Sequence, residues 1–182
     1  MTSIPAFRYH PDPIATGSAV ADGGACELCG EVTGARYAGP ILGRQAERLC
    51  LGCIADGTAA ERLGRPDGSA EFSDGLRRQS DSLPSAVLEE ILRRTPGYFS
   101  WQESYWLTHC GDGAAYLGRT GWDQIKDDDE ALKALRDEAQ ELGMDTAAAQ
   151  EWISRLSPDG DMTAYLFECL HCGVHLAYSD AN

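Results

Sequence analysis

Four cysteines lie in two close pairs, Cys26-x2-Cys29 and Cys50-x2-Cys53, with twenty residues between the pairs. A tetrahedral zinc ion needs two short loops that each present two thiolates, and this spacing supplies them. Four thiolates leave no coordination position open for a substrate. The sequence therefore predicts a structural zinc site that the chain requires in order to fold.

The residues around these pairs predict a small zinc-binding unit. Gly30 follows Cys29 and can adopt the left-handed backbone conformation that a tight metal-binding turn tends to require. A hairpin-like stretch connects the two pairs, and residues 54–63 are expected to form a short helix despite Gly57. A knuckle, a hairpin and two ligands at the start of a helix resemble a treble-clef or ribbon-like zinc finger.

The use of cysteine also indicates where such a protein works. Seven cysteines are an odd number, and the N-terminus lacks the basic and apolar regions of a signal peptide. Both observations favour a cytoplasmic protein, in which persistent disulfides are rare and paired cysteines bind metal. Gly, Pro or a charge interrupts every apolar run, so no membrane helix is expected.

The second half of the chain carries helical patterns and a hairpin. Apolar residues at helical spacing predict one helix that starts near Ser85 and ends before Pro96, a second over 132–142, and a third capped by Asp145. Two strands are expected on either side of Cys169-x2-Cys172. The aromatic side chains between these elements are expected to be core anchors: Tyr98, Phe99, Trp101, Tyr105 and Trp106.

Together these patterns predict an α+β fold. A zinc-stabilised unit with an N-terminal arm would occupy 1–64, and a helical region closed by the C-terminal knuckle hairpin would occupy 82–182. Residues 65–81 are rich in Gly, Pro, Asp and Ser, which is typical of a linker or of a surface loop within one continuous domain.

Cys169 and Cys172 supply two ligands for a second zinc ion, so further ligands must come from elsewhere. Cys110 is the only remaining cysteine, and the histidines nearest these cysteines in sequence are His109, His171 and His175. Adjacent residues such as His109 and Cys110 rarely bind one ion together. This favours a set of three thiolates and one imidazole: Cys110, Cys169, Cys172 and His175. The cofactor is therefore Zn²⁺, with one ion or two.

An alternative interpretation is a metal- or thiol-dependent enzyme. His109 would polarise the Cys110 thiol and Asp112 would orient the imidazole, in a pocket completed by His175 and Asp180. Neighbours in sequence are a poor guide to side-chain contact. The chain also lacks the phosphate-binding glycine motifs, the serine-nucleophile elbow and the helical zinc-protease motif. A non-catalytic protein is therefore favoured.

The charge of the chain constrains its partners. The net charge is −14, and the segment 123–161 alone holds twelve acidic and four basic residues, a local charge of −8. Nucleic-acid binders usually carry a basic patch, so nucleic acid is not an expected partner. The acidic segment is a solvated face or a docking surface for a basic protein.

Several long blocks of the sequence resemble the CbrC family of bacterial proteins. They are FRYHPDPIATG at 7–17, CELCG at 26–30, CIADG at 53–57, RTPGY at 94–98, WLTHCGD at 106–112 and CLHCGVHLAYSD at 169–180. The family is named for a colicin-tolerance phenotype and brings no established catalytic residues. The resemblance therefore implies a bacterial, cytoplasmic protein tied to envelope stress or toxin tolerance. Together with the closed thiolate site and the acidity of the chain, it predicts a zinc-binding protein that acts through a protein partner in toxin tolerance or immunity.

Overall fold

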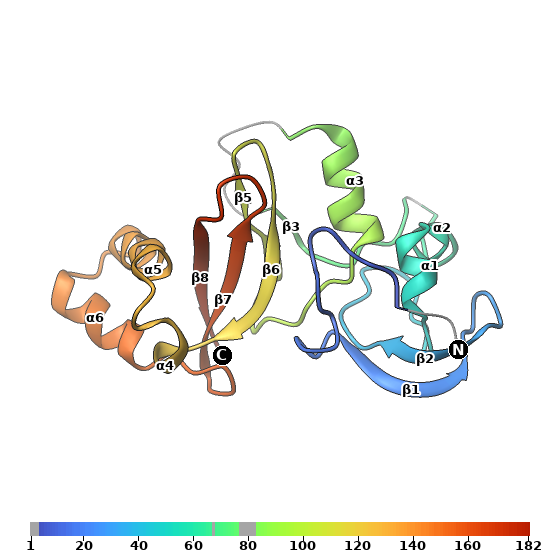
Figure 1. The fold of residues 1–182 in the computed structure, drawn as a ribbon, viewed down its shortest axis with the longest axis horizontal. Helices are drawn as coiled ribbons and strands as arrows, with labels where there is room; N and C mark the ends of the chain where they lie inside the picture. The colour runs from blue at the N-terminus through green and yellow to red at the C-terminus, as the bar shows by residue number, and fades with distance from the viewer. Residues whose placement is uncertain (1–3, 67, 77–82) are drawn as a thin grey trace.

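The computed structural model describes residues 4–66, 68–76 and 83–182, and it mixes helices with sheets that are mainly antiparallel (Figure 1). The N-terminal part is a hairpin followed by two short helices: β1 (Ala19–Ala25), β2 (Val32–Tyr37), α1 (Leu51–Ala55) and α2 (Thr58–Arg62). A helix and a pair of two-residue parallel strands follow: α3 (Ser85–Arg94), β3 (Gly75–Leu76) and β4 (Tyr105–Trp106).

The C-terminal part is a four-stranded antiparallel sheet with the strand order β5-β6-β7-β8. Its strands are β5 (Thr108–His109), β6 (Asp112–Thr120), β7 (Met162–Cys169) and β8 (His175–Ala181). Three helices follow β6 and precede β7: α4 (Trp122–Ile125), α5 (Asp129–Glu141) and α6 (Thr146–Ser154). The predicted C-terminal hairpin is thus the β7–β8 half of a larger sheet.

This sheet separates two cores, because successive side chains of a strand point to opposite faces. On β7, Tyr165 and Phe167 enter an aromatic core, whereas Ala164 joins a core formed with α5 and α6. In the aromatic core the rings of Tyr98 and Tyr116 stack with their centroids 4.0 Å apart. In Figure 1 the sheet stands between α5 and α6 on one side and α3 on the other.

The N-terminal arm joins the two parts of the molecule. Phe7 is buried in the N-terminal core and Tyr9 in the aromatic core, where the Tyr9 carbonyl accepts a hydrogen bond from the Tyr116 amide at 2.8 Å. His10 is fully buried, with Nδ1 lying 2.6 Å from the Pro96 carbonyl oxygen. Burial lowers the pKa of His10 to about 4, so this ring is neutral at pH 7.

The predicted helices of the second half are confirmed, and their ends follow from the sequence. The Asp145 side chain accepts a hydrogen bond from the Ala148 amide at the start of α6, as an N-cap residue does. After α5, Gly143 adopts a φ of +86°, which ends the helix at little steric cost. The helix α3 lies inside the predicted span and stops before Pro96.

Three expectations for the chain need correction. The helix predicted over 54–63 is interrupted at Gly57, whose φ of +86° cannot continue a right-handed helix, so α1 and α2 are separate. The segment 68–76 is only partly a surface loop: Ala70 and Phe72 are fully buried in the N-terminal core, whereas Gly68, Ser69 and Asp74 are exposed. Asp67 and residues 77–81 lie outside the described residues. Among the aromatic anchors, Tyr98 and Trp106 are buried, but Phe99 is 63% exposed and Trp101 is 44% exposed.

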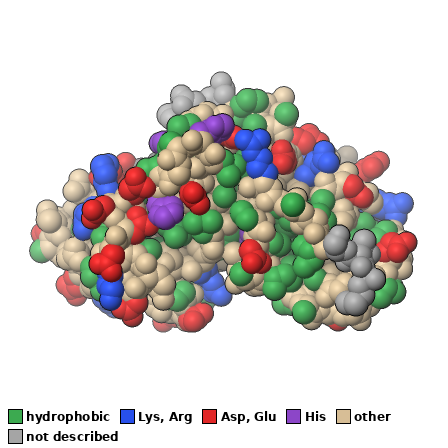
Figure 2. Space-filling view, in the orientation of Figure 1, with side chains coloured by type: hydrophobic (Ala, Val, Ile, Leu, Met, Phe, Trp, Pro, Cys, Tyr) green, Lys and Arg blue, Asp and Glu red, His purple; other side chains and the backbone are tan. Residues whose placement is uncertain are grey.

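The acidic segment forms one region of the surface. Residues 123–161 span most of α4, α5 and α6 and hold twelve acidic and four basic residues. Figure 2 shows acidic side chains spread over this part of the molecule, with Lys and Arg side chains among them. Among the described residues, every helix is too short or too polar to span a bilayer.

Candidate metal centres

The N-terminal cluster consists of Cys26, Cys29, Cys50 and Cys53. Its first two cysteines lie on the turn between β1 and β2. The Gly30 amide donates to the Cys26 carbonyl at 2.8 Å, and Gly30 has a φ of +76°, the left-handed conformation expected for this turn. The sequence CELCG therefore folds locally into a knuckle that presents two sulfurs.

The other two cysteines of the N-terminal cluster start α1. Cys50 is the N-cap residue, and its sulfur accepts a hydrogen bond from the Cys53 amide at 3.4 Å. The Cys50 amide donates in turn to the Cys26 sulfur at 3.4 Å. Because the free amides at a helix start point toward these sulfurs, they stabilise negative charge there.

The spacing of these four sulfurs matches a tetrahedral zinc site. Zinc–sulfur bonds of about 2.3 Å in a tetrahedron place neighbouring sulfurs about 3.8 Å apart. The sulfurs of Cys26 and Cys53 are 3.9 Å apart, and those of Cys29 and Cys50 are 3.8 Å apart. All four sulfurs lie within 4.8 Å of one another, so the cluster could hold one ion.

The thiols of the N-terminal cluster oppose one another's ionisation. Burial raises the pKa of the Cys26 thiol, but backbone amides, led by that of Cys29, outweigh this effect and lower the pKa to about 7. Burial and the neighbouring sulfurs raise the pKa of Cys53 above its ordinary value. A divalent cation between the sulfurs would remove this repulsion and allow all four to ionise.

The C-terminal cluster consists of His109, Cys110, Cys169 and Cys172, which come from two turns of the four-stranded sheet. The His109 Nδ1 atom lies 3.3 Å from the Cys110 sulfur and 3.4 Å from the Cys172 sulfur, and these two sulfurs are 3.9 Å apart. Zinc bonds of about 2.3 Å to sulfur and about 2.05 Å to nitrogen give a sulfur–nitrogen separation of about 3.6 Å. This donor set also fits one zinc ion.

Ionisation is uneven in the C-terminal cluster as well. A hydrogen bond with the Cys172 sulfur, followed by burial, raises the pKa of Cys110 to about 11. Burial raises the pKa of Cys169, but the amides of Cys172 and His171 outweigh this effect and lower it to about 6. One thiolate thus forms readily, and further thiolates need a cation nearby.

The structure brings together the three cysteines predicted for a second site, but it places His109 beside them instead of His175. The His175 Nδ1 atom lies 2.5 Å from a carboxylate oxygen of Asp128, and the His175 amide donates to Glu130. The sequence argument against His109 assumed ordinary backbone at Cys110. Cys110 instead has a φ of +52°, and this left-handed turn brings its sulfur to the neighbouring imidazole.

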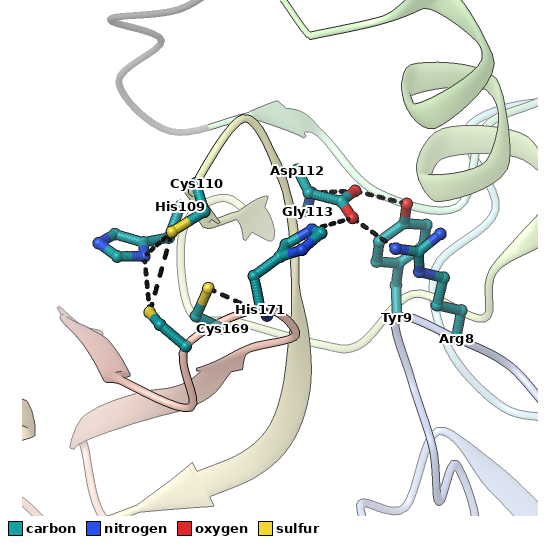
Figure 3. A network of polar contacts seen from close by, with 9 residues as sticks. Arg8, Tyr9, His109, Cys110, Asp112, Gly113, Cys169 and His171 are labelled. Atoms are coloured by element: carbon teal, nitrogen blue, oxygen red, sulfur yellow. Dashed lines mark hydrogen bonds and ion pairs between the residues drawn. The ribbon is translucent and has the colours of Figure 1, made fainter.

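The enzyme interpretation requires Asp112 to face His109, but Asp112 points elsewhere. Its carboxylate accepts hydrogen bonds from Tyr9 at 2.7 Å and from Arg8 at 2.6 Å, and it lies 2.9 Å from the His171 Nε2 atom. Figure 3 shows the His171 ring directed to Asp112, on the side away from His109. Burial raises the pKa of Asp112, but hydrogen bonds from Tyr9 and His171 outweigh it and lower the pKa. Asp112 therefore ties the N-terminal arm to the C-terminal turn.

Comparison with other proteins identifies similar chains in several bacteria. The proteins named "UPF0167 protein Mb2317" of Mycobacterium bovis and "UPF0167 protein MT2352" of Mycobacterium tuberculosis are each 45% identical over 179 residues, which covers 97% of this chain and 93% of theirs. The "UPF0167 protein PA1536" of Pseudomonas aeruginosa is 35% identical over 173 residues, 93% of each chain. No solved structure matches the chain significantly.

The names of these three relatives state no activity and do not mention CbrC or colicin tolerance, so that role stays a prediction from the sequence. The sequence profile of the family described as "Uncharacterised protein family (UPF0167)" matches residues 4–181, nearly the whole chain. The protein, with its two cysteine clusters, therefore belongs to the UPF0167 family.

Proposed function

We propose that this protein is a two-zinc protein whose metal ions hold its fold together and leave its surface to bind another protein. The observation that carries the proposal is the spacing of the donor atoms within each four-donor cluster. Neighbouring sulfurs of the same cluster are 3.8 or 3.9 Å apart. Each cluster offers a complete set of four donors, which is typical of structural rather than catalytic zinc. The N-terminal cluster, with its knuckle and its helix start, would form a treble-clef-like unit.

Each ion would join segments that are distant in the sequence. The N-terminal ion would fix the β1–β2 turn to the start of α1, and the C-terminal ion would fix the β5–β6 turn to the β7–β8 turn. Zinc bound to structural thiolate sites contributes about 10–16 kcal/mol of binding free energy in small zinc-finger peptides at pH 7, and this energy stabilises the folded chain.

Metal counting tests this part of the proposal. Native mass spectrometry of purified protein should show two zinc ions for each chain, and the variant Cys172→Ser should show one. The matched variant Cys53→Ser removes a donor from the other cluster and should also lose one ion. Wild-type protein that binds fewer than two zinc ions, or a Cys53→Ser or Cys172→Ser variant that keeps both ions, would contradict the proposal.

The partner that the surface favours is a basic protein. The chain carries a net charge of −14, and its most acidic segment spans α4, α5 and α6 (Figure 2). Complementary charge speeds encounter and selects among partners. The resemblance to the CbrC family makes basic toxin domains the first candidates, in a tolerance or immunity role in the bacterial cytoplasm.

A matched pair of charge variants tests the partner. The variant Asp127→Lys/Glu151→Lys/Asp159→Lys changes three exposed residues of the acidic segment, and the control Glu31→Lys/Glu47→Lys/Glu61→Lys makes the same change in net charge on the N-terminal part. Wild type and control should bind a basic toxin domain in low salt, and the first variant should bind it at least about tenfold more weakly. No binding by wild type across a panel of such domains, or equal loss in both variants, would contradict the proposed docking face.

A further inference from the structure

The two clusters differ in how many of their cysteines are exposed to solvent. In the N-terminal cluster Cys26, Cys50 and Cys53 are buried, and Cys29 alone is exposed. In the C-terminal cluster Cys110 and Cys172 are both exposed, and Cys169 alone is buried. A dissolved reagent can therefore reach two sulfurs of the C-terminal cluster but one of the N-terminal cluster.

The two exposed sulfurs are also neighbours. The sulfurs of Cys110 and Cys172 are 3.9 Å apart. The exposed Cys29 of the N-terminal cluster instead has the buried Cys50 as its neighbour, with their sulfurs 3.8 Å apart. Cys50 is fixed as the N-cap residue of α1. Cys110 and Cys172 instead lie on turns, each followed by a glycine with positive φ, at Gly111 and Gly173. Closing a sulfur–sulfur bond of about 2.05 Å thus requires movement of turns, not of a helix start.

We propose that Cys110 and Cys172 are an oxidation site at which a hydroperoxide forms a disulfide and thereby dismantles the C-terminal metal site. This inference rests on the proposed function, since it takes the C-terminal cluster to be a zinc site. Reactivity toward oxidants follows thiolate character and exposure, and both sulfurs are exposed donors that a zinc site holds as thiolates.

The chemistry balances with hydrogen peroxide as the oxidant. One thiolate attacks a peroxide oxygen, a sulfur–oxygen bond forms as the oxygen–oxygen bond breaks, and hydroxide leaves. The second thiolate attacks the resulting sulfenic sulfur, and a second hydroxide leaves as the disulfide forms. The two sulfurs have lost two electrons to the peroxide, and two protons taken up from the buffer acid convert the two hydroxides to water. Only His109 and Cys169 then remain as donors, which is half of a tetrahedral set.

The test treats the wild-type protein with hydrogen peroxide and measures zinc and disulfides separately. Zinc is counted by native mass spectrometry before treatment, and released zinc is followed with a coloured chelator. Remaining thiols are alkylated, and the protein is digested with trypsin. Cys110 lies in peptide 95–119, Cys169 and Cys172 lie in 156–182, and the N-terminal cluster is divided between 9–36 and 49–62.

The expected result is the loss of one of two zinc ions, with peptides 95–119 and 156–182 joined and Cys169 alkylated. Dithiothreitol and added zinc should restore the two-ion protein. Joining of 9–36 to 49–62 before the C-terminal peptides, or a disulfide that includes Cys169 in place of Cys172, would overturn the inference. Fewer than two zinc ions for each chain before peroxide treatment would contradict the proposed function. The disulfide map is a separate readout, because it shows which cysteines are oxidised whatever the number of zinc ions.

Discussion

The two cysteine clusters offer the same number of donors but occupy different surroundings. Three sulfurs of the N-terminal cluster belong to a hydrophobic core that also contains Leu49, Ile54 and Phe72. The C-terminal cluster lies on two turns at one end of a sheet whose own core is a set of packed aromatic rings. Similar coordination chemistry can thus organise a core in one place and fasten surface turns in another.

This difference follows from how much apolar surface each part can bury without metal. The N-terminal part is small, and a domain of about 60 residues is only marginally stable from burial alone. The C-terminal sheet buries large aromatic side chains such as Tyr116, Tyr165 and Phe167, and it is covered by α5 and α6. We therefore expect loss of metal to unfold the first part and to loosen only the turns of the second.

The largest expected effect comes from removing a buried ligand of the N-terminal cluster. Cys53→Ser should abolish zinc binding there and cost more than about 5 kcal/mol, because zinc binding supplies folding free energy and typical total stability is about 5–15 kcal/mol. Amide spectra should show collapsed dispersion for residues 18–66. A variant that unfolds cooperatively within about 1 kcal/mol of wild type would show that this core does not depend on metal.

A smaller effect is expected from the exposed cysteine of the other cluster. Cys172→Ser should lose one zinc ion but cost only about 2–3 kcal/mol, since the sheet keeps its aromatic core. Hydrogen exchange should quicken at the two turns, residues 108–113 and 169–175, and stay slow in the centre of β6 and β7. Loss of protection throughout the sheet would remove the distinction between the two clusters.

The free energy of unfolding should depend on pH through His10, a buried residue of the N-terminal arm that joins the two parts. Its pKa is lowered to about 4 in the folded chain, so below pH 6.5 the unfolded chain binds more protons and stability falls as the pH falls toward 4. Between pH 7.5 and 5.5 this group should account for about 1 kcal/mol of lost stability. Urea unfolding of zinc-loaded wild type and His10→Gln at both pH values checks this. Equal pH dependence in the two proteins would contradict it.

The smallest effect is expected at the histidine that the sequence favoured as a ligand. His175→Ala should keep two zinc ions and cost about 1 kcal/mol or less, because it removes one partly exposed contact with Asp128. The matched variant His109→Ala should lose the ion of the C-terminal cluster. Zinc loss in His175→Ala but not in His109→Ala would reverse the assignment of the fourth donor.

The contrast between the clusters also explains what could be predicted from the sequence. The N-terminal donors are set by local spacing: a Gly-terminated knuckle and a helix start each fix two sulfurs. The C-terminal histidine depends on a single backbone angle, the φ of +52° at Cys110, and on the register that pairs Ala114 with Cys169. Neither quantity can be read from residue types.

The strand β6 was not predicted for a related reason. Its sequence, DGAAYLGRT, contains two glycines and lacks regular alternation of polar and apolar residues. Gly113 is required by close packing, since a Cβ atom there would lie 2.5 Å from Ile91 and 2.9 Å from Tyr9. The strand therefore owes its place to the arm and α3 packed against it, which a local pattern does not contain.

Anomalous diffraction from crystals of the purified protein at the zinc absorption edge tests the central claim most directly. We expect two peaks for each chain, one about 2.3 Å from the four sulfurs of the N-terminal cluster and one about 2.3 Å from three sulfurs and about 2.05 Å from the His109 Nδ1 atom. A missing peak at either cluster, or a second ion bound by His175 in place of His109, would contradict the account.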